Sequence, residues 1–129
     1  MPHRASFSVS TDERVTTVDL TDRVERTLPE TPSGTCTVFV EHTTAGISIN
    51  EAEPRLREDI EHALTELVPE SGWAHDEIDD NADAHLRSML LGRSVTIPVT
   101  DGSLGLGTWQ SVLLVECDGP RTRSLTVTC

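Results

Sequence analysis

The sequence predicts an α+β fold with a mostly antiparallel or mixed sheet and two main helices. Three observations lead to this prediction. Runs rich in β-branched residues lie near both ends of the chain, a strong helical periodicity occupies the middle, and strands and helices do not alternate as in a parallel α/β fold. Because the 129 residues contain no linker or repeat, we expect a single domain over 1–129.

The first half of the chain should supply four strands and one short helix. Strand-like composition is found at 3–10, 15–19, 35–42 and 46–50. The short helix is expected from Asp22 to about Leu28, because Asp22 and Glu25 have the spacing of a capping box.

The strongest helical signal follows. Apolar residues recur at one-turn and two-turn spacing, with prolines near the start and after the end: Leu56, Ile60, Ala63, Leu64 and Leu67 between Pro54 and Pro69. A second helix is expected from about Asn81 to Leu91, ended by Gly92. The rest of the chain reads as strands at 94–99, 109–117 and 123–128.

Charge restricts the partners of this protein. The net charge is −12 and the sequence pI is about 4.6, so binding of nucleic acid or an anionic membrane is not expected. Ten arginines and no lysine exclude a lysine Schiff base and the lysine of a phosphate-binding P-loop. A phosphate ligand would therefore be met by arginine or by a metal ion.

The cysteines and the N-terminal segment suggest the compartment. Cys36, Cys117 and Cys129 are odd in number and widely spaced, so we expect reduced thiols that serve as small apolar core residues. No apolar run is long enough for a membrane helix, and the polar start lacks the apolar core of a signal peptide. These features favour a cytoplasmic protein.

Three histidines are candidate metal ligands. His42 continues the apolar row of its strand, where a lone histidine is usually a hydrogen-bonded core residue. His75 precedes an acidic cluster, and His85 lies in the second predicted helix. A strand, a loop and a helix could bring these imidazoles to one metal ion with an open coordination position.

Two arginines are candidate phosphate ligands. Arg121 and Arg123 alternate onto one side of the last strand, where their guanidinium groups could bind a phosphate or diphosphate. Pairing with the surplus carboxylates is an equally good explanation of the two arginines. On the preceding strand, Gln110 and Glu116 share a face and bracket an apolar pair.

The acidic candidates have structural alternatives. Glu51 follows the end of a strand, and Asp59 lies at the edge of the apolar stripe of its helix, where it could point into a cleft or into solvent. Asn50 and Glu53 have capping-box spacing and could simply begin the helix. The acidic cluster at 76–80 could supply the N-cap of the second helix, or one of its members could hold a divalent cation.

Six blocks occur along the chain in a specific order. They are "EHTTAGISINE", "LVPE" followed by "HDE", "NADAHL", "LLGRSVTIPV", "GSLGLGTWQ" and "ECDGPR". In this order and at these spacings they resemble the YjbQ family, also called the secondary thiamine-phosphate synthase family. The resemblance extends from about residue 5 to residue 127.

The resemblance implies a compact, sandwich-like fold, assembly as a homotrimer, and a secondary activity that makes thiamine phosphate. Together with the residue patterns above, it leads us to expect substrate binding by Thr43, Asn50, Thr108, Gln110 and Arg121 within these blocks and by Arg123 just after the last block. The reaction joins a hydroxymethylpyrimidine diphosphate to a thiazole phosphate, which displaces pyrophosphate and needs no protein nucleophile. The enzyme must align the reactants and stabilise the charge of the leaving group.

We therefore expect a small phosphorylated metabolite as the ligand and no organic cofactor. The expected catalytic residues are His42, Glu51, Asp59 and Glu116, and a zinc, manganese or magnesium ion is expected at His42, His75 and His85. Two alternatives remain open at this point. One is metal-assisted hydrolysis of a phosphorylated metabolite, with Glu51 or Glu116 as the base. The other is a non-catalytic trimeric protein that binds a metabolite or a metal.

Overall fold

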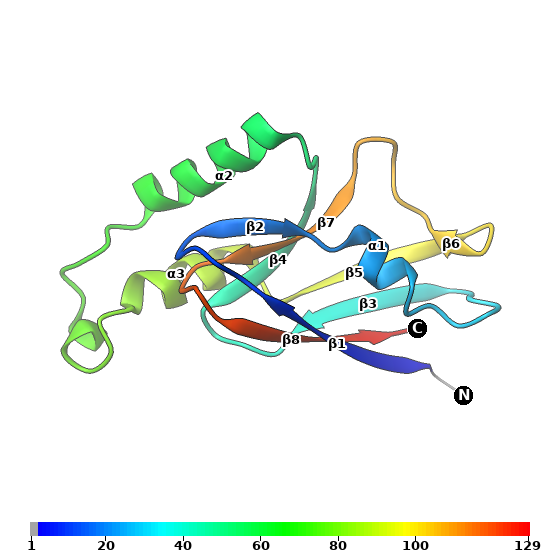
Figure 1. The fold of residues 1–129 in the computed structure, drawn as a ribbon, viewed down its shortest axis with the longest axis horizontal. Coiled ribbons are helices and arrows are strands. Elements are labelled where there is room, and N and C mark those ends of the chain that lie inside the picture. The colour runs from blue at the N-terminus through cyan, green and yellow to red at the C-terminus, as the bar shows by residue number, and fades with distance from the viewer. Residues whose placement is uncertain (1–2) are drawn as a thin grey trace.

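Two antiparallel sheets pack against each other in the computed structural model, which describes residues 3–129 (Figure 1). The larger sheet has the order β1 (Arg4–Ser10), β8 (Thr122–Thr128), β3 (Thr35–Val40), β5 (Ser94–Thr100) and β6 (Ser103–Leu104). The smaller sheet has the order β2 (Thr16–Asp19), β7 (Ser111–Glu116) and β4 (Ala45–Asn50). The predicted α+β class and the antiparallel sheet are confirmed.

The main core lies between the two sheets. On β3 the alternation of apolar residues directs Val38 and Val40 inward, and both are fully buried. They pack in one cluster with Ile47 and Leu114 of the smaller sheet and with Leu125 of β8. Because the two sheets share this core, the connections between them are held in fixed positions.

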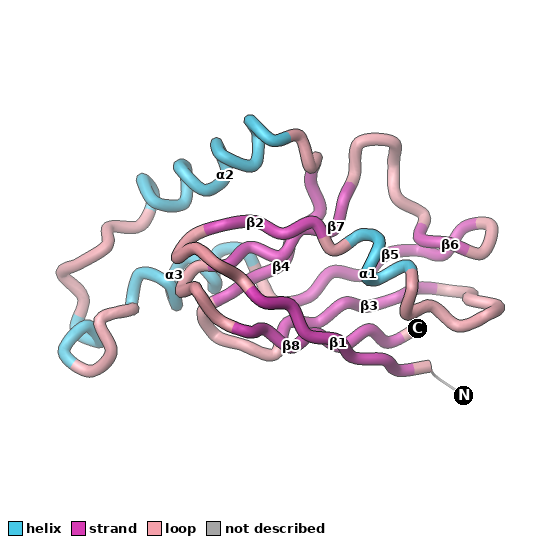
Figure 2. Tube along the Cα trace, in the orientation of Figure 1, coloured by secondary structure: helices cyan, strands magenta, loops and turns pink. Residues whose placement is uncertain are grey.

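The helices are α1 (Thr21–Glu25), α2 (Pro54–Leu67), a single turn of 3-10 helix η1 (Ala74–Glu77) and α3 (Ala82–Leu91). Helix α2 lies on the outer side of the smaller sheet and α3 lies at one end of the molecule, whereas α1 lies toward the β6 end and places Val24 in the main core (Figures 1 and 2). The main helices occur where the sequence periodicity places them. Between α2 and α3 the chain makes a long excursion that contains η1 as its only helical turn among the described residues (Figure 2).

The capping residues differ from the sequence prediction. The N-cap of α2 is Glu53 itself, whose carboxylate accepts from the N–H of Leu56 over 2.7 Å, so Asn50 plays no part in it. The first helix begins after Leu20 without a side-chain cap, and Glu25 accepts instead from the N–H of Leu104. At α2 a different local residue therefore forms the cap, whereas at α1 a contact with a residue distant in sequence replaces the expected capping box.

A buried ion pair joins α3 to the end of α2. Arg87 donates to Asp83 over 2.7 Å, and its other nitrogens donate to the carbonyl oxygens of Leu64 and Val68. These carbonyl groups lie at the C-terminal end of α2, where the carbonyl oxygen of Leu64 also accepts from the N–H of Val68 and Val68 itself follows the last helical residue. Arg14 adds a two-pronged contact to Asp83 at 2.9 and 3.0 Å. The position of α3 is therefore fixed by charge as well as by packing.

The expectation of three reduced cysteines is wrong for two of them. Cys36 and Cys129 form a disulfide, because the pairing of Thr37 with Thr128 places the two cysteines side by side on adjacent strands. Cys117 is free and buried, as expected, and burial raises the pKa of its thiol to about 12. Within residues 3–129 there is no helix of the length and apolar character that crossing a bilayer requires.

Candidate functional site

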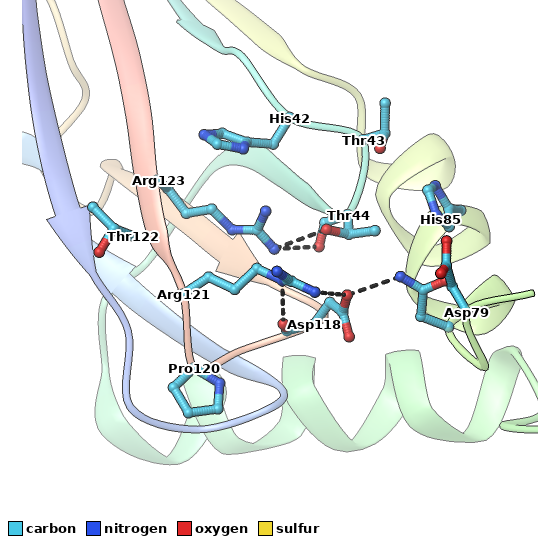
Figure 3. A pocket seen from close by; sticks show the side chains of 11 residues that line it. His42, Thr43, Thr44, Asp79, His85, Asp118, Pro120, Arg121, Thr122 and Arg123 are labelled. Carbon is cyan, nitrogen blue, oxygen red and sulfur yellow. Dashed lines mark hydrogen bonds and ion pairs between the residues drawn. The ribbon is translucent and has the colours of Figure 1, made fainter.

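A cavity of about 460 Å³ opens where the chain passes twice from one sheet to the other (Figure 3). The first passage, between β3 and β4, supplies His42, Thr43 and Thr44. The second, between β7 and β8, supplies Asp118, Pro120 and Arg121, and continues into Thr122 and Arg123 of β8. The segment around the start of α3 closes the third side with Asp79, Asn81 and His85. Strands that diverge at these passages leave the space between them.

Arg123 is held in this cavity by a buried ion pair with Glu116. Neither side chain is more than 2% exposed. Nε of Arg123 donates to Glu116 over 2.8 Å, and Nη2 donates to the other carboxylate oxygen and to two oxygens of Thr44. The remaining nitrogen, Nη1, makes no hydrogen bond to a described residue. Arg123 can therefore offer one terminal nitrogen to a ligand without leaving its partners.

Glu116 is a structural carboxylate in this arrangement. It also accepts from the hydroxyl of Thr11 over 2.8 Å and from the N–H of Asp118 over 3.0 Å. Burial alone would raise the pKa of Glu116, but the hydrogen bonds from Arg123, Asp118 and Thr11 outweigh it and hold that pKa below its ordinary value. Because Glu116 is ionised, buried and outside the cavity lining, its role is to position Arg123.

Arg121 is oriented by a chain of hydrogen bonds that starts on the α3 side. The side-chain nitrogen of Asn81 donates to Asp118 over 2.9 Å, and Asp118 accepts from Nε and Nη2 of Arg121, each over 3.0 Å. Nη1 of Arg121 has no partner among the described residues, and the side chain is 52% exposed. In Figure 3 the two guanidinium groups lie one above the other between His42 and Asp118.

His42 is neutral and has a defined tautomer. Its Nε2 accepts from the backbone N–H of Ser124 over 2.8 Å, so in the neutral ring the proton is on Nδ1. Burial and the positive charge of Arg123 lower the pKa of His42, which favours this neutral form. His42 therefore serves as a hydrogen-bond donor, and its Nε2 lone pair is already used.

The three predicted metal ligands do not converge within one chain. His75 and His85 lie edge to face with ring centroids 4.9 Å apart, whereas His42 stands on another wall and has its Nε2 engaged. Among residues 3–129 there is no group of three or more His, Cys, Asp or Glu side chains arranged to hold a metal ion. The residues present do not fit the three-histidine metal site.

The other predicted residues lie elsewhere. Asn50, Glu51 and Gln110 line a separate cavity of about 330 Å³ beside the exposed Trp109. Thr108 is exposed in the loop before β7 and lines neither of these cavities. Asp59 is exposed on α2 and has no hydrogen-bond partner among the described residues, which agrees with its alternative interpretation as a solvated boundary residue.

Sequence reasoning missed four polar side chains of the main cavity: Thr44, Asn81, Asp118 and Thr122. Thr44 and Asp118 stand inside the conspicuous blocks "HTTA" and "ECDGPR", where a signal was available. Asn81 was expected only as a helix start. It is indeed the N-cap residue of α3, but its side chain makes no cap, and its buried Oδ1 has no donor among the described residues.

Comparisons with known proteins agree on one family. Residues 5–129 match the family model described as UPF0047 protein YjbQ-like. A UPF0047 protein of Archaeoglobus fulgidus is 49% identical over 122 residues, which make up 94% of this chain and 96% of that protein.

Solved structures show the same relationship. The crystal structure of a YbjQ-like protein of unknown function from Sulfolobus solfataricus has a TM-score of 0.95 at 42% identity, covering 99% of this chain and 96% of its own. That of a hypothetical protein from Aeropyrum pernix has a TM-score of 0.92 at 46% identity, covering 96% and 95%. This chain therefore belongs to the YjbQ (UPF0047) family.

Proposed function

We propose that the main cavity binds a phosphorylated metabolite through Arg121 and Arg123. The observation that supports this most strongly is the pair of guanidinium groups in one cavity, each with an Nη1 that has no partner among the described residues. Phosphate oxygens suit such donors, because charge-assisted hydrogen bonds from arginine are about twice as strong as neutral ones. The hydroxyl groups of Thr43, Thr44 and Thr122 line the same cavity.

The charge of the whole chain makes this local concentration of arginine significant. A net charge of −12 repels a phosphorylated ligand at long range. Asp118 lies beside Arg121, but its Oδ2 is already committed to Arg121 and Asn81. His42 adds an uncharged donor, so a ligand phosphate would be met by two cationic groups and one neutral N–H.

The reaction we propose is the synthesis of thiamine phosphate, as the family resemblance implies. The thiazole nitrogen attacks the methylene carbon of the pyrimidine diphosphate, a C–N bond forms, and the C–O bond to the diphosphate breaks. The bonding electrons leave with the diphosphate oxygen, so the developing negative charge is what the protein must stabilise. Arg121 and Arg123 are the groups suited to that task. No protein base or nucleophile takes part.

This scheme agrees with the carboxylate positions better than hydrolysis does. A hydrolase would need Glu51 or Glu116 as the base beside the bound phosphate. Glu116 is buried and occupied by Arg123, and Glu51 lines a different cavity. Because the three histidines do not fit a metal site, no step of the proposed reaction uses one. Binding of zinc, manganese or magnesium stays a prediction of the sequence.

The proposal is tested by product formation. Purified protein is incubated with the pyrimidine diphosphate and the thiazole phosphate, and thiamine phosphate is separated by chromatography and quantified. We expect product from the wild type and from Arg55→Gln, whose arginine lies exposed on α2 at 89%. Arg121→Gln removes the same charge from the cavity and should lower the rate at least about tenfold. Equal rates for the two variants, or no product from the wild type, would reject the proposed activity.

A further inference from the structure

A third guanidinium group lies next to the main cavity but outside its lining. It belongs to Arg93, in a cavity of about 310 Å³ that is lined by Phe39, Val40, Glu41, His42, Thr43 and Arg93. His42 and Thr43 also line the main cavity, where Figure 3 shows both side chains. The two spaces therefore adjoin at the connection between β3 and β4, and each contains arginine.

The side chain of Arg93 is anchored close to the backbone. Its carbonyl oxygen accepts from the N–H of Val40 over 2.8 Å, and its Nε donates to the carbonyl oxygen of His42 over 3.0 Å. These two hydrogen bonds hold the residue at both ends of its side-chain stem. A guanidinium group that is already oriented loses little further freedom when it binds an anion.

Both terminal nitrogens of Arg93 are available to a ligand. Neither makes a hydrogen bond to a described residue, because Nε carries the one side-chain contact of Arg93. Both nitrogens also reach the surface, since the buried side-chain polar atoms without a partner in residues 3–129 belong to His75 and Asn81. Two accessible terminal nitrogens on one planar group match the spacing of two phosphate oxygens.

Pairing with a carboxylate does not explain Arg93. The chain has 22 acidic residues, and Glu41 lines the same cavity. Nevertheless, Arg93 forms no ion pair with a described residue, unlike Arg55 and Arg121, which pair with neighbouring carboxylates. Glu41 is exposed, so solvent and salt screen its repulsion of an incoming anion.

We infer that Arg93 forms a second anion-binding site, which takes a phosphate monoester while the main cavity holds another phosphate group. The site goes beyond the proposed function, because Arg93 lies outside the main cavity. Its use rests on the proposed function, in which both reactants are phosphorylated. The diphosphate carries the greater charge and matches the two arginines of the main cavity. The monoester of the second reactant then binds at Arg93, and His42 and Thr43 lie between the two phosphates.

NMR of the arginine side chains tests the inference site by site. Inorganic phosphate is titrated at constant ionic strength, and the Nε–H signals are followed in proton–nitrogen correlation spectra. Loss of one signal in Arg93→Lys and of another in Arg121→Gln identifies the two residues. We expect a saturable shift of the Arg93 signal, with a dissociation constant that changes by less than about twofold in Arg121→Gln and in the control Arg55→Gln, as for independent sites.

Three variants change this cavity in different directions. Arg93→Gln should weaken phosphate binding at least about tenfold, read from the backbone N–H of Glu41, and leave the response of Arg121 unchanged within about twofold. Arg93→Lys keeps the charge and should weaken binding less than Arg93→Gln. Glu41→Gln removes the opposing charge and should strengthen binding, read from the Arg93 signal. A gain in affinity cannot come from a misfolded variant.

The outcomes distinguish this site from the proposed function. Absence of a saturable shift at Arg93, or equal affinity in Arg93→Gln, overturns the second site and leaves the main cavity unaffected. A saturable shift at Arg93 without one at Arg121 keeps the second site and overturns phosphate binding in the main cavity. A shift at Arg93 that disappears in Arg121→Gln indicates one shared site and overturns the inference.

Kinetics test which reactant the site takes. Arg93→Gln should raise KM for the thiazole phosphate at least about tenfold and change KM for the pyrimidine diphosphate by less than about twofold. The opposite split between the two reactants would overturn the assignment of the monoester to Arg93.

Discussion

Replacing Glu116 by glutamine should strongly destabilise the fold, because it leaves Arg123 charged and buried without a counter-charge. The change keeps the size of the side chain. It replaces a carboxylate that accepts from Arg123, Thr11 and Asp118 with an amide that can accept at one oxygen only. With exposures of 0% for Glu116 and 2% for Arg123, water cannot compensate for the loss.

The expected cost is about 3–5 kcal/mol, the range for removing one partner of a buried ion pair. Domains of this size have about 5–15 kcal/mol of stability in total, so the loss should be easy to measure. Urea unfolding followed by circular dichroism gives the free energy of unfolding, and all variants are compared at one protein concentration. Glu30→Gln is the matched control, since Glu30 is exposed, and should change stability by less than about 0.5 kcal/mol.

A double variant and the pH dependence sharpen this test. Glu116→Leu with Arg123→Met removes both charges and should be less destabilised than Glu116→Gln alone. The pKa of Glu116 is lowered in the folded protein. The ionised carboxylate therefore contributes to the free energy of unfolding above the unfolded-state pKa of about 4.3, and this contribution is lost as the pH falls through the lower pKa of the folded state. A loss below about 1 kcal/mol in Glu116→Gln would refute the assignment of Glu116 as the structural partner of Arg123.

Two further predictions concern thiols and His42. The native protein should show no titratable thiol, and the denatured, unreduced protein should show one, from Cys117. After reduction the denatured protein should show three. Reduction should also lower the free energy of unfolding by up to about 4–5 kcal/mol, as expected for a crosslink between residues 93 apart. Three thiols before reduction would refute the disulfide between Cys36 and Cys129. The pKa of His42 should lie below 6.5 in a proton NMR titration, in which His42→Gln identifies the resonance. The free energy of unfolding should decrease as the pH falls below about 6.5, because the imidazole of the unfolded chain binds the proton first. A pKa of 6.5 or above would contradict the hydrogen bond from Ser124.

The elements of the fold were predictable because their signals are local. The apolar spacing from Leu56 to Leu67 and the flanking prolines define α2, which runs from Pro54 to Leu67 as expected. Alternation on β3 correctly placed Val38 and Val40 on one face. Such patterns depend on neighbours within a few residues, so a single sequence suffices to read them.

The site depends on pairings between distant strands, which local patterns do not encode. Arg121 and Arg123 were identified as candidate phosphate ligands, but nothing nearby in sequence shows that Glu116 would hold Arg123. The partner of His42 is the N–H of Ser124, 82 residues away, and the disulfide joins residues 93 apart. The register of β3 against β8 determines both the hydrogen bond from Ser124 to His42 and the disulfide. Composition suggested reduced thiols because it contains no information on that register.

The central claim is that the cavity between the two sheets binds phosphate through Arg121 and Arg123. Calorimetric titration of pyrophosphate into wild type, Arg121→Gln and Arg55→Gln tests it most directly, because it needs neither turnover nor knowledge of the organic part of the ligand. We predict saturable binding by the wild type, the same affinity within about twofold for Arg55→Gln, and at least about tenfold weaker binding for Arg121→Gln, equivalent to about 1.4 kcal/mol. Equal affinities in all three proteins, or no binding by the wild type, would contradict the claim.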